Sequence, residues 1–255
     1  MADYISYPFK TMNITQTYLG TVSHYPHTTG RPKDYPIDEA CENTGRSPMY
    51  APCDVKVVRI YGVGSKGTNT LWVTSTAKVK FANGKTDYLS MQITHPNDSD
   101  LKKLKVGQVI KKGTVICCEG TDGATGNHIH LSAGMGTITN GGWVQNSNGK
   151  WVLTTSGGTV KPEQAFYLDS KFTKVKNAHG LTFKALPTVK TVRYKVATDT
   201  LNVRKGAGTS YAIAGVLHDR TVVEITTTKT VGKVKWGKLA NGNGWICLKY
   251  CKKEG

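Results

Sequence analysis

The fold is decided by Val106-Gly-Gln-Val-Ile-Lys-Lys-Gly-Thr-Val-Ile-Cys-Cys-Glu-Gly-Thr-Asp-Gly-Ala-Thr-Gly126, which is followed at once by Asn127-His128-Ile129-His130-Leu131. Short apolar runs alternate in it with glycine turns, a pattern typical of strands joined by tight loops. Side chains two residues apart point to the same face of a strand, so we expect His128 and His130 to face the same way. Two imidazoles on one face suit a metal site, in which one binds Zn²⁺ and the other moves a proton.

The rest of the chain is also typical of β structure. Glycine accounts for 28 of the 255 residues, and period-two alternation is visible in Asp54–Tyr61, Thr70–Ser75 and Val79–Phe81. Helical patterns are scarce, and the candidates are Pro162–Tyr167, with proline near its start, and Ser99–Leu104. We therefore predict a mostly β fold built from antiparallel sheets.

The net charge is +17, and it is concentrated towards the C-terminus. Residues 190–255 hold 13 Lys and Arg against 4 Asp and Glu. A basic protein favours polyanions such as nucleic acid, anionic lipid or anionic wall polymers. Because the sequence lacks a Lys/Arg tract, an aromatic RNA motif and a recognition-helix pattern, we do not expect nucleic acid as the partner. The basic end is interpreted as an attachment region, with ordinary solvated lysines as the alternative.

Targeting signals are not apparent in the sequence. No apolar run is long enough for a transmembrane helix, so membrane insertion is not expected. The start, Met1–Pro8, lacks the basic and apolar regions of a signal peptide. We therefore expect the chain to stay in the cytoplasm of the cell that makes it, with its six cysteines as reduced thiols.

The stretch from Val106 to His130 resembles the lysostaphin-type zinc endopeptidases, which cut the peptide part of bacterial cell walls. The pattern of that family reads roughly "vGq-vkkG-vig-G-TG-HxH", and the match runs in order through the whole stretch. Asn127 replaces the usual proline, and Cys117-Cys118 replace a small apolar residue and a glycine. Neither departure removes a metal ligand. The resemblance implies a β-sheet metallopeptidase domain that uses Zn²⁺.

The resemblance also implies a ligand set. In the family, a His and an Asp of an early HxxxD motif bind the metal together with the second His of the His-x-His pair. His130 is therefore expected to be a ligand, and His128 to lie beside the bound water. The early Asp corresponds to Asp38, because its flanks, through Pro48–Val58, resemble the family's "GiDia…tpvyAp-dG-Vv". The alternative for Asp38 is a turn cap.

The first histidine of the motif is missing, because Asp34 stands four residues before Asp38. Two histidines lie a little upstream, His24 and His27, and a loop could bring either back beside Asp38. We favour His27 as the ligand, then His24, then Asp34. Two carboxylates in the site would leave the metal ion less able to acidify its water than two histidines and one carboxylate.

The family has a further catalytic histidine on a strand upstream of the "vGq" turn. Here His95 follows the strand-like Tyr88–Thr94. The resemblance therefore implies that His95 and His128 are the catalytic pair, one accepting a proton from water or stabilising the oxyanion, the other protonating the leaving amine. A surface histidine at a strand end is the alternative for His95.

A second resemblance covers the C-terminal part. Leu201–Tyr211 is similar to the "LNVRsGPgtsy" opening of bacterial SH3-like wall-binding domains, and Val234–Tyr250 matches their "W-kv…G-GWv…Y" close. The resemblance implies a small SH3-like β-barrel, with Tyr211 and Trp236 as candidate wall contacts and barrel core as the alternative for both. The expected domains are residues 1–170 for the peptidase, 171–190 for a linker and 191–255 for wall binding.

Together, these features favour a peptidoglycan endopeptidase with a wall-binding module, and the arrangement looks like a bacteriophage endolysin. The expected partners are bacterial peptidoglycan and anionic wall polymers, reached from the host cytoplasm once another protein has opened the membrane. Two alternatives stay open. One is a catalytically inactive wall-binding or virion structural protein, which the missing histidine supports. The other is a zinc amidase that cuts the sugar–peptide link.

Overall fold

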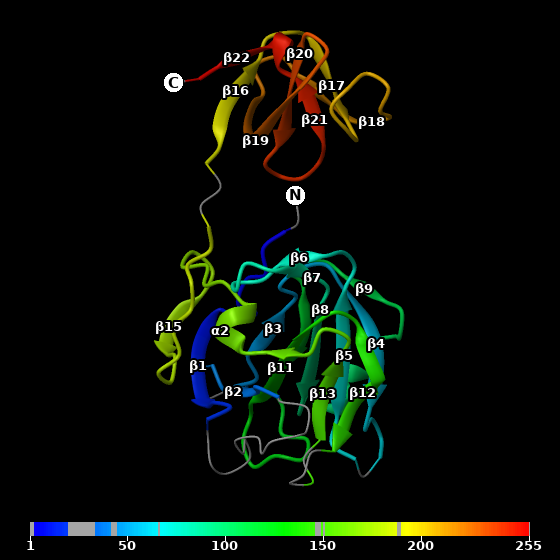
Figure 1. The fold of residues 1–255 in the computed structure, drawn as a ribbon, viewed down its shortest axis with the longest axis vertical. Coiled ribbons are helices and arrows are strands. Elements are labelled where there is room, and N and C mark those ends of the chain that lie inside the picture. The colour runs from blue at the N-terminus through cyan, green and yellow to red at the C-terminus, as the bar shows by residue number, and fades with distance from the viewer. Residues whose placement is uncertain are drawn as a thin grey trace. The chain divides into compact units, whose positions relative to one another are not determined.

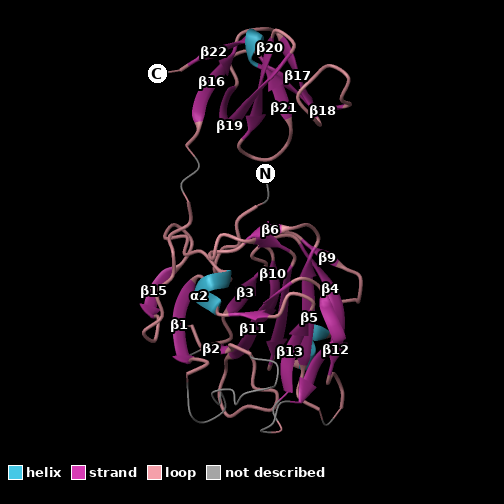
Figure 2. Ribbon diagram, in the orientation of Figure 1, coloured by secondary structure: helices cyan, strands magenta, loops and turns pink. Residues whose placement is uncertain are grey.

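The computed structural model describes residues 3–19, 34–41, 45–65, 67–145, 149, 151–187 and 190–254, and Figure 1 shows the path of the chain. Strands make up most of the regular structure and helices are few (Figure 2). The predicted mostly β, antiparallel class is thereby confirmed. The chain divides into two compact units, Met1–Leu186 and Pro187–Gly255, and each has a hydrophobic core of its own.

The first unit is built on one large sheet. Its strands are β1 (Thr11–Gln16), β2 (Ile37–Glu39), β4 (Val55–Tyr61), β5 (Thr70–Ser75), β8 (Leu89–Thr94), β9 (Val109–Ile110), β11 (Ile129–Met135), β14 (Thr159–Val160) and β15 (Lys174–Asn177). The strand order is β15-β1-β2-β11-β8-β5-β4-β9, and β14 also pairs with β11. The pairings of these strands are antiparallel except that of β1 with β15, which is parallel.

Smaller pairs and two short helices complete the first unit. The pairs are β3 (Pro48–Tyr50) with β10 (Val115–Cys118), β6 (Val79–Lys80) with β7 (Thr86–Asp87), and β12 (Ile138–Gln145) with β13 (Trp151–Thr155). The helices are α1 (Asp98–Leu101) and α2 (Pro162–Ala165). Both lie within or next to the ranges that the sequence predicts. Helix α2 stops early because Phe166 returns to an extended backbone and buries its ring.

The central strands β5 and β8 are buried along nearly their whole length, and their apolar residues alternate so that one face forms the core. Leu71 and Val73 on β5, and Met91 and Ile93 on β8, are fully buried in the core of the first unit. Their neighbours in sequence point to the other face, which we call the site face. Among the described residues, no helix is long and apolar enough to cross a membrane.

Strand register aligns polar side chains across the site face in two rows. In the first row, Asp38, His130, Thr94, Thr70 and Tyr61 are successive opposite partners from β2 to β4. Opposite residues in a sheet have neighbouring side chains on the same face. The row therefore runs from a carboxylate and an imidazole at one end to an exposed tyrosine at the other.

The second row lies one pleat further along the strands. It consists of Ser132, Gln92, Trp72 and Arg59, again as opposite partners on β11, β8, β5 and β4. Trp72 is fully buried and Gln92 is 4% exposed. The site face thus changes from hydroxyl and amide groups near β11 to aromatic and cationic groups near β4.

The second unit is a seven-stranded antiparallel sheet. Its elements are β16 (Val192–Val196), β17 (Thr200–Arg204), β18 (Ile213–His218), β19 (Val222–Val231), β20 (Val234–Leu239), β21 (Trp245–Cys247), the 3₁₀ helix η1 (Leu248–Tyr250) and β22 (Cys251–Lys253). The strand order is β18-β17-β21-β20-β19-β16-β22. Val196, Leu201, Ile225, Trp236 and Ile246 form the centre of its core.

Part of the segment expected to be a linker is a strand. Lys174–Asn177 forms β15 and pairs with β1 in the first unit. The Thr173 hydroxyl, one residue before it, donates to the carbonyl of Phe9 at 2.7 Å. The alternation Lys-Val-Lys fits an edge strand with both lysines in solvent, a pattern that glycine and proline nearby obscured in the sequence.

Gly120 provides a test of how tightly the loop before β11 is packed. A Cβ atom at Gly120 would lie 2.2 Å from the carbonyl oxygen of His95, whereas one at Gly126 would meet nothing within 4 Å. We expect Gly120→Ala to destabilise the first unit by about 2 kcal/mol and to lower its melting temperature by about 6 °C. Gly126→Ala is the control, and equal melting temperatures for the two variants would contradict this packing.

Candidate metal centre

Asp38 and His130 face each other on neighbouring strands. They are opposite partners in the β2–β11 pairing, and His130 Nδ1 lies 3.1 Å from Asp38 Oδ1. Their side chains are 13% and 20% exposed, so neither is completely buried. The register of two short strands therefore brings together residues that are 92 positions apart in sequence.

His128 approaches the same carboxylate oxygen. Its Nε2 lies 3.8 Å from Asp38 Oδ1, so the two histidines of the pair face the same way. Its Nδ1 lies 2.9 Å from the carbonyl of Gly126. A carbonyl accepts only, so Nδ1 carries a proton, and in the neutral ring the lone pair is then at Nε2.

His95 closes the cluster from the end of β8. Its ring centroid is 4.5 Å from that of His128 and 6.2 Å from that of His130. Its Nδ1 lies 2.7 Å from the carbonyl of Asp122, which fixes the same tautomer as in His128 and leaves Nε2 as an acceptor. Burial is the main reason that the pKa of His95 falls from 6.5 to about 4, so the ring is neutral near pH 7.

The backbone of His95 explains how the ring reaches the cluster. Its φ is +82°, a left-handed value that is uncommon for any residue except glycine. The turn is held by hydrogen bonds from the His95 N–H to the carbonyl of Asn69 at 3.0 Å, and from the Asp122 N–H to the carbonyl of His95 at 3.3 Å. Backbone strain of this kind often accompanies functional side chains.

The donor geometry fits a tetrahedral metal ion. Bonds of about 2.0–2.1 Å at a tetrahedral angle place two donor atoms about 3.3 Å apart, close to the 3.1 Å between His130 Nδ1 and Asp38 Oδ1. Nitrogen and oxygen donors are those that Zn²⁺ commonly takes in hydrolytic sites. Asp38 and His130 would thus supply two of the three protein ligands that such a site needs.

A third candidate ligand is not apparent among the described residues. Within the described ranges, no group of three or more His, Cys, Asp or Glu residues is placed to hold a metal ion. Asp34 is 2% exposed, and its Oδ2 accepts hydrogen bonds from the Ser132 hydroxyl at 2.9 Å and the Leu153 N–H at 3.2 Å. His24 and His27 lie outside the described residues, so the preference for His27 stays a prediction.

A cleft of about 520 Å³ extends from the histidines along the site face. Its lining consists of Tyr61, Gly67, Thr68, Thr70, Gln92, Thr94, His95, His130, Trp143 and Trp151. The aromatic members of this lining were not predicted from the sequence. The available signal was that three of the five tryptophans lie between residues 72 and 151, in strand-like segments near the His-x-His motif.

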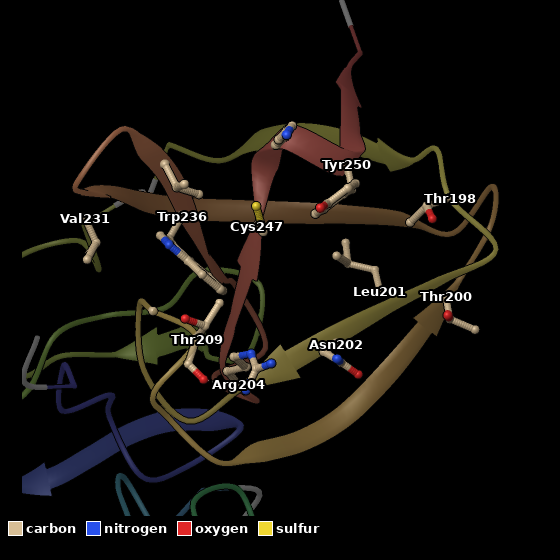
Figure 3. A pocket seen from close by; sticks show the side chains of 13 residues that line it. Thr198, Thr200, Leu201, Asn202, Arg204, Thr209, Val231, Trp236, Cys247 and Tyr250 are labelled. Carbon is tan, nitrogen blue, oxygen red and sulfur yellow. Dashed lines mark hydrogen bonds between the residues drawn. The ribbon is translucent and has the colours of Figure 1, made fainter.

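The second unit carries its own cavity, of about 590 Å³ (Figure 3). Trp236 lies at its wall together with Arg204 and Tyr250, but Trp236 is only 4% exposed and also belongs to the core. Tyr211 is 48% exposed. Its ring packs over Gly206, where a Cβ would lie 2.5 Å from it, and its carbonyl accepts from Arg204 Nη1 at 2.8 Å.

Fold and site together define a mostly β protein with a histidine–carboxylate cluster in an open cleft. No protein-family model matches the chain, and no curated protein does. Among solved structures, it is similar to lysostaphin in solution, at 15% identity over 83% of this chain and 79% of that chain, with a TM-score of 0.34. A second similar structure is the antimicrobial peptidase lysostaphin from Staphylococcus simulans, at 15% identity over 95% and 91% of the two chains and a TM-score of 0.35.

A third similar structure is a zinc-containing peptidase from Vibrio cholerae, at 24% identity over 53% of this chain and 37% of that chain, with a TM-score of 0.33. These TM-scores are all below 0.5. The functional assignment therefore depends on the site itself.

Proposed function

We propose that the protein is a zinc-dependent peptidoglycan endopeptidase. The observation that carries this proposal is the convergence of His130 Nδ1 and His128 Nε2 on one oxygen of Asp38, with the His95 ring beside them in a cleft. A carboxylate, three imidazoles and an open groove are the parts that metal-assisted hydrolysis requires. The sequence resemblance to wall peptidases supplies the substrate class.

The ion at Asp38 and His130 would polarise the scissile carbonyl and lower the pKa of a water molecule. His95 and His128 each hold a lone pair at Nε2, because their Nδ1 protons are engaged by backbone carbonyls. Either imidazole can therefore accept a proton from water at that atom and deliver it to the leaving amine. The buried position of His95 keeps it neutral, in the form that a base requires.

Digestion of purified cell walls separates this proposal from its alternatives. The endopeptidase should bind about one Zn²⁺ per chain and release fragments cut within the stem or crosslink peptides, and chelation should stop this release. A zinc amidase would instead release intact stem peptides from the sugar. A catalytically inactive wall-binding protein would bind walls without any product, and either outcome would contradict the endopeptidase.

For the second unit we propose attachment to the cell wall, through its basic charge and its exposed Tyr211. Tyr211→Ala should weaken the affinity for purified walls by about tenfold, because an exposed aromatic anchor contributes roughly 1–2 kcal/mol to a binding surface. The measurement is a wall pull-down at fixed salt. Trp236 is a poor probe because its side chain belongs to the core. Tyr250 is exposed and lines the cavity, so Tyr250→Ala is the matched comparison. Undiminished sedimentation of Tyr211→Ala would contradict a wall contact at this residue.

A further inference from the structure

One wall of the cleft in the first unit is aromatic. Trp143 on β12 contacts Trp72 and Tyr61 edge to face, each with ring centroids 4.8 Å apart. Trp151 on β13 lies against Trp143 at 4.9 Å with a tilt of 35°, and it is 51% exposed. We call Tyr61, Trp143 and Trp151, which line the cleft, the aromatic wall, and the fully buried Trp72 packs beneath it. An exposed aromatic surface of this size needs an explanation beyond packing.

A bulge in β12 places Trp143 on this wall. The β12–β13 register shifts between Ile138 and Trp143, and Gly142 within the bulge has a φ of +101°. A Cβ at Gly142 would lie 2.5 Å from Trp72 Nε1, so only glycine allows this approach. The Trp72 indole N–H donates to the carbonyl of Gly142 at 3.0 Å. Bulges often re-aim a side chain next to a functional site.

Arg59 makes the wall rigid from behind. Its guanidinium lies 5.0 Å from the ring centroid of Trp143, 5.1 Å from that of Trp72 and 5.7 Å from that of Tyr61. Its Nη1 donates to the carbonyl of Gly141 in the bulge. The rings are thus held in place before any ligand arrives, which lowers the entropy cost of binding.

The floor of the same cleft is polar. Thr70, Thr94 and Gln92 line it beside the aromatic wall. Gln92 is 96% buried, and its Oε1 has no hydrogen-bond partner within the described part of the chain. A buried acceptor without a partner is costly, so a ligand donor that reached this oxygen would be favoured.

We propose that this part of the cleft binds an N-acetylated sugar of the glycan strand. A pyranose ring has apolar faces and a rim of hydroxyl groups, so it suits an aromatic wall next to hydroxyl and amide groups. Its acetamido N–H is a donor of the kind that Gln92 Oε1 lacks. An extended peptide of small residues would match the polar floor but would leave the tryptophans without a partner. The inference rests on the proposed function, because it names the part of peptidoglycan that the cleft binds.

The spacing of the strands sets the distance between the aromatic wall and the metal centre. Tyr61 lies three strands from His130, by way of Thr94 and Thr70, which is about 14 Å at the usual strand spacing. An extended peptide covers about 3.4 Å per residue. A sugar on the aromatic wall would therefore place a bond about four residues along the stem peptide at the metal centre. The sugar–peptide link itself would lie too close to the wall to reach it.

Binding of a sugar probe tests the site without any catalysis. The trisaccharide of N-acetylglucosamine is titrated into the full-length protein while the indole N–H signals are followed by NMR. We expect the signals of Trp143 and Trp151 to shift, and Trp151→Ala to weaken binding about tenfold, whereas Trp151→Phe retains most of it. Val175→Ala, exposed on β15 at the opposite edge of the sheet, is the control. Unshifted signals, or equal binding by Trp151→Ala, would overturn the proposal.

Kinetics on two soluble substrates test whether a bound sugar positions the peptide for cleavage. One substrate is a crosslinked stem peptide that carries its disaccharide, and the other is the same peptide without sugar. The wild type should prefer the sugar-bearing form by about tenfold in kcat/KM, and Trp151→Ala should bring the ratio close to one. Equal cleavage of both by the wild type would refute the sugar site while leaving the endopeptidase intact. Cleavage of neither would refute the endopeptidase, and the sugar titration would still decide the binding site.

Discussion

His130→Ala is expected to abolish both zinc binding and wall lysis. The substitution removes the imidazole whose Nδ1 lies 3.1 Å from Asp38 Oδ1, and the remaining donors cannot hold the ion in place. A metal ion contributes several kcal/mol to hydrolysis, so the lytic rate should fall by about 10³-fold or more. The measurements are zinc content by atomic absorption and the loss of turbidity of purified walls.

Two variants control this experiment. Asp38→Asn keeps the shape of the side chain but removes its charge, and it should also lose zinc. His179→Ala removes an exposed histidine of the first unit that lies outside the cluster, and it should retain both zinc and lysis. Normal lysis by His130→Ala would contradict the assignment of the metal centre.

His95→Asn is expected to keep its zinc and to lose activity by about 10²–10⁴-fold, the usual contribution of a positioned acid or base. Asparagine tolerates the left-handed backbone at this position, where φ is +82°, so the turn should survive while the imidazole is lost. The zinc content and the circular dichroism spectrum should match the wild type. Loss of zinc in this variant would contradict a proton-transfer role. Full activity would show that His95 is a strand-end histidine without a catalytic role.

The β class could be predicted from the sequence because it depends on local patterns, such as the alternation in β4. The two-residue spacing of His128 and His130 predicted that both imidazoles face the same way, whereas Asp38 and His95 were expected from the family resemblance. In the structure, both imidazoles lie near Asp38, with His95 close by.

Other features depend on contacts between distant residues. The aromatic wall needs a bulge at Gly142 and the packing of Arg59 behind it, and neither leaves a periodic signal. The pairing of β15 with β1 joins segments 163 residues apart at Thr11 and Lys174. Asp34 accepts hydrogen bonds from Ser132 and Leu153, and these contacts could not be predicted without the fold.

The most direct measurement is anomalous diffraction at the zinc edge from crystals grown with Zn²⁺. We expect a single strong peak within bonding distance of His130 Nδ1 and Asp38 Oδ1, with His95 and His128 close by but not both bound to it. A peak at another place in the first unit, or none at full zinc loading, would contradict this expectation.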